Sequence, residues 1–157
     1  MEERSMARQL HAEIEVDAAP ERVWEALTDF AAYHEWNPFI VQAAGRPVPG
    51  SRLELRMRLP GRRPTTFRPQ VLEAEPGRRL RWLGRLLVPG LFDGEHSFTI
   101  EPAGPGRSHL RQHEEFRGLL APLVLALIAK PTLEGFHQMN QALAARVAQS
   151  NHTDATP

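Results

Sequence analysis

The sequence predicts an α+β domain in which a curved antiparallel sheet of about six or seven strands wraps around one long C-terminal helix. Before residue 119, most of the chain alternates apolar and polar residues with a period of two, a pattern typical of half-buried strands. The stretch 119–149 instead places Leu133, Phe136 and Leu143 on one stripe at helical spacing. Because such a stripe must be buried against another element, we expect this helix to be the axis of the fold.

The smaller elements are expected in a simple order. A first strand over 8–17 is followed by a short helix that begins at Pro20 and by a second short helix over 30–36, which ends at Asn37. Further strands are expected over 39–44, 52–59, 66–75, 78–84, 95–101 and 108–116. The stretch 86–94 is expected to be a loop.

Composition limits the classes of function. The chain has 157 residues, enough for one domain with a sizeable core. Lys and Arg number 19 and Asp and Glu number 19, and this lack of net charge argues against a nucleic-acid partner. The absence of cysteine excludes a disulfide framework and thiolate chemistry, and it is consistent with a reducing, cytoplasmic location.

The expected domain spans residues 8–149. Residues 1–7 are charged, lack an apolar run and predict a flexible leader rather than a signal peptide, whereas residues 150–157 predict a disordered tail. The longest apolar run, 119–129, has eleven residues and is followed by Lys130 and Pro131. Because a spanning helix needs roughly 20 apolar residues, we expect no transmembrane segment.

The hairpin formed by 95–101 and 108–116 has an unusual inner face. Its other face is entirely polar and must meet water, which turns His96, Gln112 and Glu114 inward beside apolar neighbours. In one register His96 lies across from Glu114, and a two-residue slip places it across from Gln112. An inward Glu is costly unless it is paired.

These three residues allow two interpretations. They could form a satisfied polar network that holds the hairpin in register, or the polar end of an apolar pocket. In a pocket, a carboxylate and an imidazole can orient a ligand or move a proton. The same choice applies to His137 and Asn140, two polar residues on the apolar stripe of the long helix.

Several motifs resemble a known superfamily. The opening signature of the SRPBCC superfamily, which includes START domains and Bet v 1-like allergens, is similar to residues 19–30 (APERVWEALTDF) and 33–39 (YHEWNPF). Its bacterial polyketide cyclase/dehydrase-like branch is similar to residues 79–82 (RLRW), 94–98 (GEHSF), 114–118 (EEFRG) and 136–140 (FHQMN). The resemblance covers roughly residues 8–148 and implies the helix-grip fold.

The resemblance also implies an elongated apolar cavity between the sheet and the long helix, which binds a hydrophobic small molecule. The candidate ligand-binding residues are Trp36, Leu55, Met57, Trp82, His96, Phe98, Gln112, Glu114, Phe116, Phe136, His137 and Asn140. His96 and Glu114 are also the candidate catalytic pair. Pro131 is expected to kink the long helix, with a separate and more mobile segment before it that covers the pocket entrance.

Cofactor and metal sites are not expected. The sequence contains no nucleophile elbow and no nucleotide-binding glycine pattern. His109 and His113 share one strand face, but that face is the wet one and Arg111 stands between them, which argues against a metal.

Three functions remain open from the residues. The first is binding or transport of a lipid-like or polyketide-like molecule. The second is a cyclase or dehydratase-like enzyme that uses His96 and Glu114 as acid and base. The third is an interaction module that uses the apolar segment 119–129 to dock a partner protein or to form a homodimer.

Overall fold

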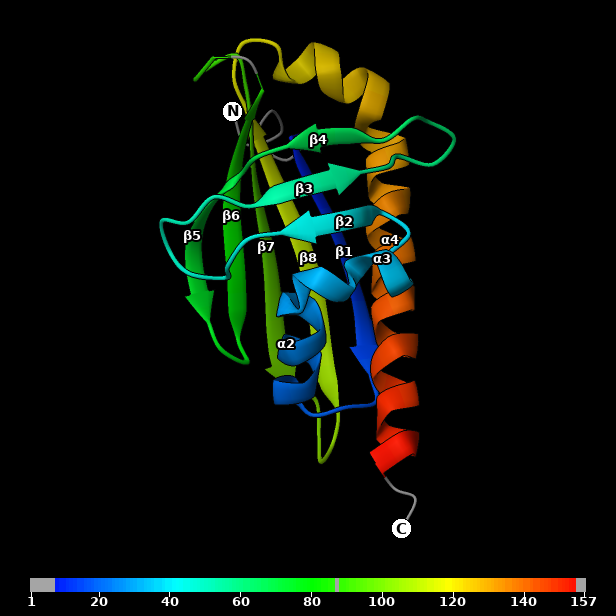
Figure 1. The fold of residues 1–157 in the computed structure, drawn as a ribbon. Coiled ribbons are helices and arrows are strands. Elements are labelled where there is room, and N and C mark those ends of the chain that lie inside the picture. The colour runs from blue at the N-terminus through cyan, green and yellow to red at the C-terminus, as the bar shows by residue number, and fades with distance from the viewer. Residues whose placement is uncertain (1–7, 87, 155–157) are drawn as a thin grey trace.

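The computed structural model describes residues 8–86 and 88–154. Figure 1 shows the order of elements along the chain. They are β1 (Gln9–Val16), α2 (Pro20–Thr28), η1 (Phe30–Ala32), α3 (Tyr33–Trp36), β2 (Ile40–Ala44), β3 (Glu54–Met57), β4 (Thr65–Phe67), β5 (Gln70–Glu75), β6 (Arg79–Leu86), β7 (Phe92–Pro102), β8 (Ser108–Arg117) and α4 (Ala121–Asp154).

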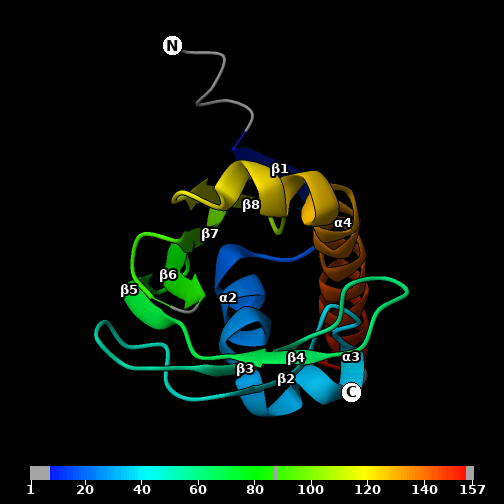
Figure 2. The ribbon, with the colours of Figure 1, turned by 90° about the horizontal axis from the view of Figure 1, so that it is seen from above.

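The strands form two antiparallel sheets. The larger sheet has five strands in the order β1-β8-β7-β6-β5, and the smaller has three in the order β2-β3-β4. Seen from above, the two sheets and α4 surround α2, which contacts both β7 and α4 (Figure 2). The predicted α+β fold with a long C-terminal helix is confirmed, but the strands form two sheets rather than one sheet of six or seven strands, and α2 rather than α4 lies at the centre.

Two strand boundaries differ from the sequence-based expectation. The single strand predicted over 66–75 is wrong, because β4 and β5 belong to different sheets and are separated by Arg68 and Pro69. Proline cannot donate to a strand ladder, so the chain changes sheets at this point. The loop predicted over 86–94 is also too long, because β7 already begins at Phe92, which pairs with Leu86.

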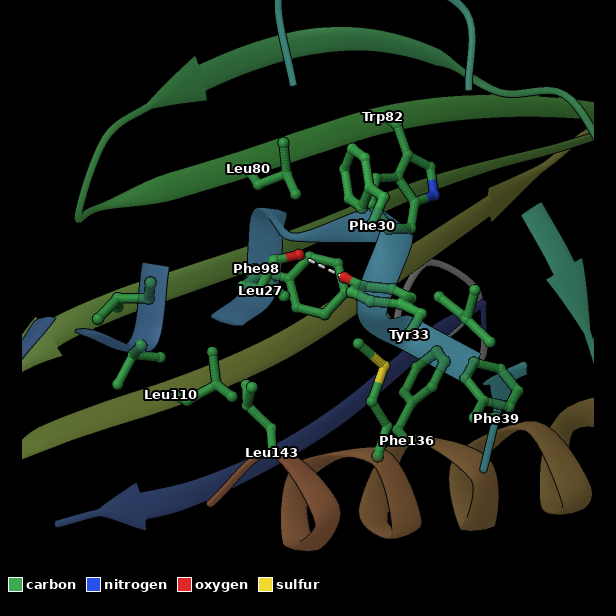
Figure 3. Packing of buried hydrophobic residues seen from close by; sticks show 14 of the residues in the cluster. Leu27, Phe30, Tyr33, Phe39, Leu80, Trp82, Phe98, Leu110, Phe136 and Leu143 are labelled. Atoms are coloured by element: carbon green, nitrogen blue, oxygen red, sulfur yellow. Dashed lines mark hydrogen bonds between the residues drawn. The ribbon is translucent and has the colours of Figure 1, made fainter. Parts of the chain in front are cut away.

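The core lies between the large sheet, α2 and α4. Its largest fully buried side chains include Tyr33, Phe98, Phe136, Leu27, Leu80, Leu110 and Leu143, several of which are drawn in Figure 3. The Tyr33 hydroxyl donates a hydrogen bond to the carbonyl oxygen of Leu27. Burial raises the pKa of Tyr33, so this donor keeps its proton. Phe136 and Leu143 of the predicted α4 stripe are buried, and Leu133 is partly buried.

The α4 helix closely approaches Phe39, the residue before β2. Phe39, which precedes β2, packs edge to face on Phe136 with ring centroids 5.7 Å apart. A Cβ atom at Gly135 would overlap the Phe39 ring, so glycine permits the contact. The helix then continues to Asp154, past the expected domain boundary at 149. The expected leader 1–7 and the last residues of the expected tail, 155–157, lie outside the described residues.

The α4 helix changes direction partway along its length. Its first part (yellow) crosses one end of the large sheet, and the remainder (orange to red) runs beside β1 (Figure 1, Figure 2). Pro131 lies inside the helix and cannot donate the hydrogen bond that a regular helix directs to the carbonyl of Leu127. Arg62 Nη2 donates to that carbonyl oxygen at 3.2 Å instead. The predicted kink is present, but the helix is continuous rather than split into two elements.

Candidate functional site

The β7–β8 hairpin brings the predicted polar residues together. His96 and Glu114 are direct partners in the strand register, and both lie on the inner face. His96 Nδ1 lies 3.0 Å from Glu114 Oε2, and His96 Nε2 lies 3.0 Å from Gln112 Oε1. The imidazole therefore reaches both partners that the sequence offered as alternatives, in the register that pairs it with Glu114.

The network continues from the sheet into α4. Gln112 Nε2 donates to Asn140 Oδ1 at 2.7 Å and to the backbone carbonyl oxygen of Phe136 at 3.3 Å. Gln112 and Asn140 are almost fully buried. A continuous chain of side chains thus runs from Glu114 through His96 and Gln112 to Asn140.

The hydrogen-bond partners fix most of the protons in this chain. A backbone carbonyl can only accept, so the Gln112 atom that faces Phe136 must be the amide nitrogen. The Gln112 oxygen then faces His96, and Nε2 of His96 must carry a hydrogen atom. A hydrogen bond between Nδ1 and the Glu114 carboxylate requires one further proton, either on the imidazole or on the carboxyl group. In both forms the pair carries no net charge, which suits its largely apolar surroundings.

Aromatic rings hold the imidazole in place. Trp82 stacks on His96 with ring centroids 5.4 Å apart, Phe98 lies at 4.6 Å and Phe136 meets the ring edge-on at 4.9 Å. The His96 side chain is 5% exposed, whereas the Glu114 side chain is 18% exposed. Glu114 is therefore the end of the network that is nearest to solvent.

Two glycines lie close to this carboxylate. Gly84 and Gly94 face each other across β6 and β7. A Cβ atom at Gly94 would lie 2.6 Å from Glu114 Oε1, and one at Gly84 would lie 3.6 Å from the Phe67 ring. The Glu114 carboxylate and the rings of Phe67 and Phe116 therefore pack directly against these two glycines. Sequence reasoning missed this feature, although glycine inside a strand often marks close approach of another group.

The remaining predicted residues fall into three groups. Buried in the main core are Leu55, Trp82, Phe98 and Phe136, with Trp36 and Met57 partly buried against it. Phe116 belongs to a separate small cluster with Ala121 and Leu125 of α4. His137 is exposed, so the expectation that it faces the core is wrong. It follows Phe136 by about 100° around the helix, outside the buried arc.

Open pockets occur elsewhere on the surface. One pocket of about 400 Å³ lies among η1 and strands β2 to β4, and another of about 670 Å³ lies around the β5–β6 turn and the end of β7. None of the predicted ligand-binding residues lines either pocket.

The outer face of the large sheet carries His11, His109 and His113. His109 Nε2 lies 2.9 Å from Glu13 Oε2, and this hydrogen bond is the main cause of a lowered pKa for Glu13. The described residues contain no group of three or more His, Cys, Asp or Glu that could hold a metal ion. Among the same residues, no helix combines the length and apolarity needed to cross a membrane.

Comparison with models of known protein families identifies the family of this chain. A family model described as polyketide cyclase / dehydrase and lipid transport matches residues 7–148. The chain belongs to this family. The polyketide cyclase/dehydrase family thus accounts for the motif resemblance, within the START-like SRPBCC superfamily. A search of functionally curated proteins gave no match.

Solved structures show the same fold. A START superfamily protein from Mycobacterium smegmatis is 24% identical, with a TM-score of 0.70 over 90% of this chain and 97% of that one. The Zhui aromatase/cyclase from Streptomyces sp. R1128 is 15% identical, with a TM-score of 0.73 over 96% and 99%. Norcoclaurine synthase from Thalictrum is 14% identical, with a TM-score of 0.69 over 91% and 95%. At these identities the likeness establishes the helix-grip fold alone.

Proposed function

We propose that this polyketide cyclase/dehydrase family member binds a hydrophobic, lipid-like or polyketide-like small molecule whose polar group contacts Glu114. The observation that carries the proposal is the hydrogen-bonded chain from Glu114 through His96 and Gln112 to Asn140 in an otherwise apolar core. A core that only had to pack would be as stable, or more stable, with apolar residues at these positions. Asn140 Nδ2 is also buried without a hydrogen-bond partner.

The first part of α4 is the proposed cover of this site. Phe116, which pairs with Gly94, packs on Ala121 and Leu125 in a cluster separate from the main core. That cluster can therefore open without disrupting the packing around His96. Pro131 supplies a natural hinge, because the helix lacks a backbone hydrogen bond there. Opening would give a ligand access to Glu114 and to the glycines beside it.

A probe-displacement assay tests ligand binding. A fluorescent apolar dye is loaded and then displaced by a long-chain alcohol or by the alkane of the same length. We expect the wild-type protein to prefer the alcohol and Glu114→Gln to lose that preference. Glu115→Gln is the matched control, because the neighbouring side chain lies on the outer face and pairs with Arg117. Failure of the wild-type protein to take up the dye, or the same preference in all three proteins, would refute the proposal.

The contact between His96 and Glu114 favours a second function, an acid–base enzyme of the cyclase or dehydratase type. An imidazole and a carboxylate 3.0 Å apart can take a proton from one substrate atom and return it to another. Incubation with a poly-β-keto thioester analogue, followed by mass spectrometry, would show loss of water if the chain catalyses cyclisation with dehydration. Binding of the analogue by wild-type protein without any conversion would reject this second function.

A further inference from the structure

The first part of α4 exposes apolar side chains on the side that faces away from the sheet. Leu123 and Leu127 are 66% and 67% exposed, and their spacing of four residues places them on one side of the helix. Leu119, in the turn that precedes α4, is 84% exposed. Ala121 and Leu125 occupy the opposite side and are buried. This segment is therefore apolar on both sides, although only one side is needed for packing.

A neighbouring loop extends this surface. The backbone N–H of Leu119 donates to the carbonyl oxygen of Gly90 at 3.1 Å, which attaches the start of α4 to the β6–β7 connection. Val88 in that connection is 55% exposed. We call Val88, Leu119, Leu123 and Leu127 the leucine patch. It lies at the end of the molecule that is uppermost in Figure 1.

Basic residues border the leucine patch. The β3–β4 connection carries Arg58, Arg62 and Arg63, all exposed, and no Asp or Glu occurs between Leu55 and Leu72. The bond from Arg62 to the Leu127 carbonyl holds this connection against the patch.

The helix side of the border is basic as well. In the stretch 116–133 the only charged residues are Arg117 and Lys130. Because the whole chain has no formal net charge, this concentration of basic residues leaves the rest of the chain net acidic. Arg117 is paired with Glu115, so Lys130 and the arginines of the β3–β4 connection form the basic border of the leucine patch.

We propose that the leucine patch and its basic border dock on the surface of an anionic lipid membrane. Exposed leucines can enter the boundary between headgroups and acyl chains, while arginine and lysine approach the phosphates. A second copy of the chain is a poorer fit, because a symmetric contact would bring two basic borders together. The proposal goes beyond ligand binding and does not depend on it, since docking uses outward-facing residues that the His96 network does not touch.

Vesicle co-sedimentation of the full chain tests the proposal. One set of vesicles is pure phosphatidylcholine, and the other contains equal parts of phosphatidylcholine and phosphatidylglycerol. We expect sedimentation with the anionic vesicles only, and weaker binding as salt is added. Leu123→Glu combined with Leu127→Glu should reduce the bound fraction about tenfold or more, because charge opposes insertion. Arg58→Gln combined with Arg63→Gln should reduce it less strongly.

Matched controls come from the same chain. Val48→Glu changes another exposed apolar residue, and Arg78→Gln removes an exposed arginine at the β5–β6 turn, at the other end of the sheet. Both should bind the anionic vesicles as wild type does. Thermal melts confirm that each variant folds, which is expected because every altered side chain is exposed.

Three results would overturn the proposal. These are no sedimentation with anionic vesicles, equal binding to neutral vesicles, and unchanged binding of the double leucine variant. Self-association in ultracentrifugation that is lost in the double leucine variant, without any vesicle binding, would assign the patch to a homodimer instead. Dye uptake is measured on the same samples. A variant that loses vesicle binding but still takes up the dye separates membrane docking from the proposed ligand binding.

Discussion

At the scale of single residues, the contact between Glu114 and His96 should contribute to the free energy of unfolding. Glu114→Ala would leave the imidazole without its partner among Trp82, Phe98 and Phe136. We expect a loss of about 2 kcal/mol in the free energy of unfolding, since Glu114 is partly exposed. Combining Glu114→Met with His96→Leu should restore much of this loss. Urea unfolding of the single and double variants measures the coupling, and additive losses would show that the two residues do not act as a pair.

Gly94 offers a way to disturb the same pair without changing either member. In Gly94→Ala the new methyl group would lie 2.6 Å from Glu114 Oε1, so the carboxylate must move away from His96. We expect a change in the ¹⁵N chemical shifts of the His96 ring, together with loss of the alcohol preference. Gly84→Ala is the control, because its methyl group would meet Phe67 at 3.6 Å, an ordinary contact distance. The same ring shifts in both variants would contradict the role given to Gly94.

At the scale of elements, the contact between the β3–β4 connection and α4 depends on one proline. Pro131→Ala would restore the missing N–H and let it bond to the Leu127 carbonyl. We therefore expect Arg62→Gln to destabilise the wild-type protein by about 1 kcal/mol but to have almost no effect in the Pro131→Ala background. Equal effects in both backgrounds would mean that Arg62 stabilises the fold in some other way.

Hydrogen exchange tests whether the first part of α4 opens. Amide protons of α4 before Pro131 should exchange faster than those after it, because the first part packs on a small cluster and the second on the main core. Uniform protection along the helix would show that the first part does not open.

Whole-molecule stability should depend on pH through the outer face of the large sheet. Burial, and then the charge of the facing His11, lower the pKa of His113 below its ordinary value near 6.5. The folded chain thus binds fewer protons than the unfolded chain in this range. The stability contributed by His113 is fully present above pH 6.5 and is lost as the pH falls through the lower folded-state pKa.

Urea midpoints measured between about pH 7 and pH 5 give a direct check. They should fall toward the acid end, and the fall should be shallower in His113→Gln. His137→Gln is the control, because that side chain is exposed on α4. A fall of the same steepness in His113→Gln and wild type would remove His113 from the explanation.

Much of this architecture could be predicted because periodicity reports which face of an element is buried. Alternation placed His96, Gln112 and Glu114 on the inner face, and the register and hydrogen bonds agree. Periodicity does not indicate which elements contact one another. The sequence therefore predicted one strand where β4 and β5 are separated at Pro69, and it did not predict the contact of Arg62 with Leu127.

The site was predicted less completely for the same reason. A glycine has no side chain to reveal its direction, so the close approach of the Glu114 carboxylate to Gly94 became apparent only in the structure. His137 was misplaced because a helix stripe read from sequence has no sharp edge.

The position of β1 has a consequence for synthesis on the ribosome. β1 is the first strand to be made, yet its ladder partner is β8, which is completed only at Arg117. At about 5–20 residues per second, the strand waits for several seconds or longer without its neighbour. During that time its apolar positions, such as Ala12 and Val16, are available to other chains. Nascent chains stalled before β8 should therefore aggregate or recruit chaperones, whereas chains that have released α4 should not.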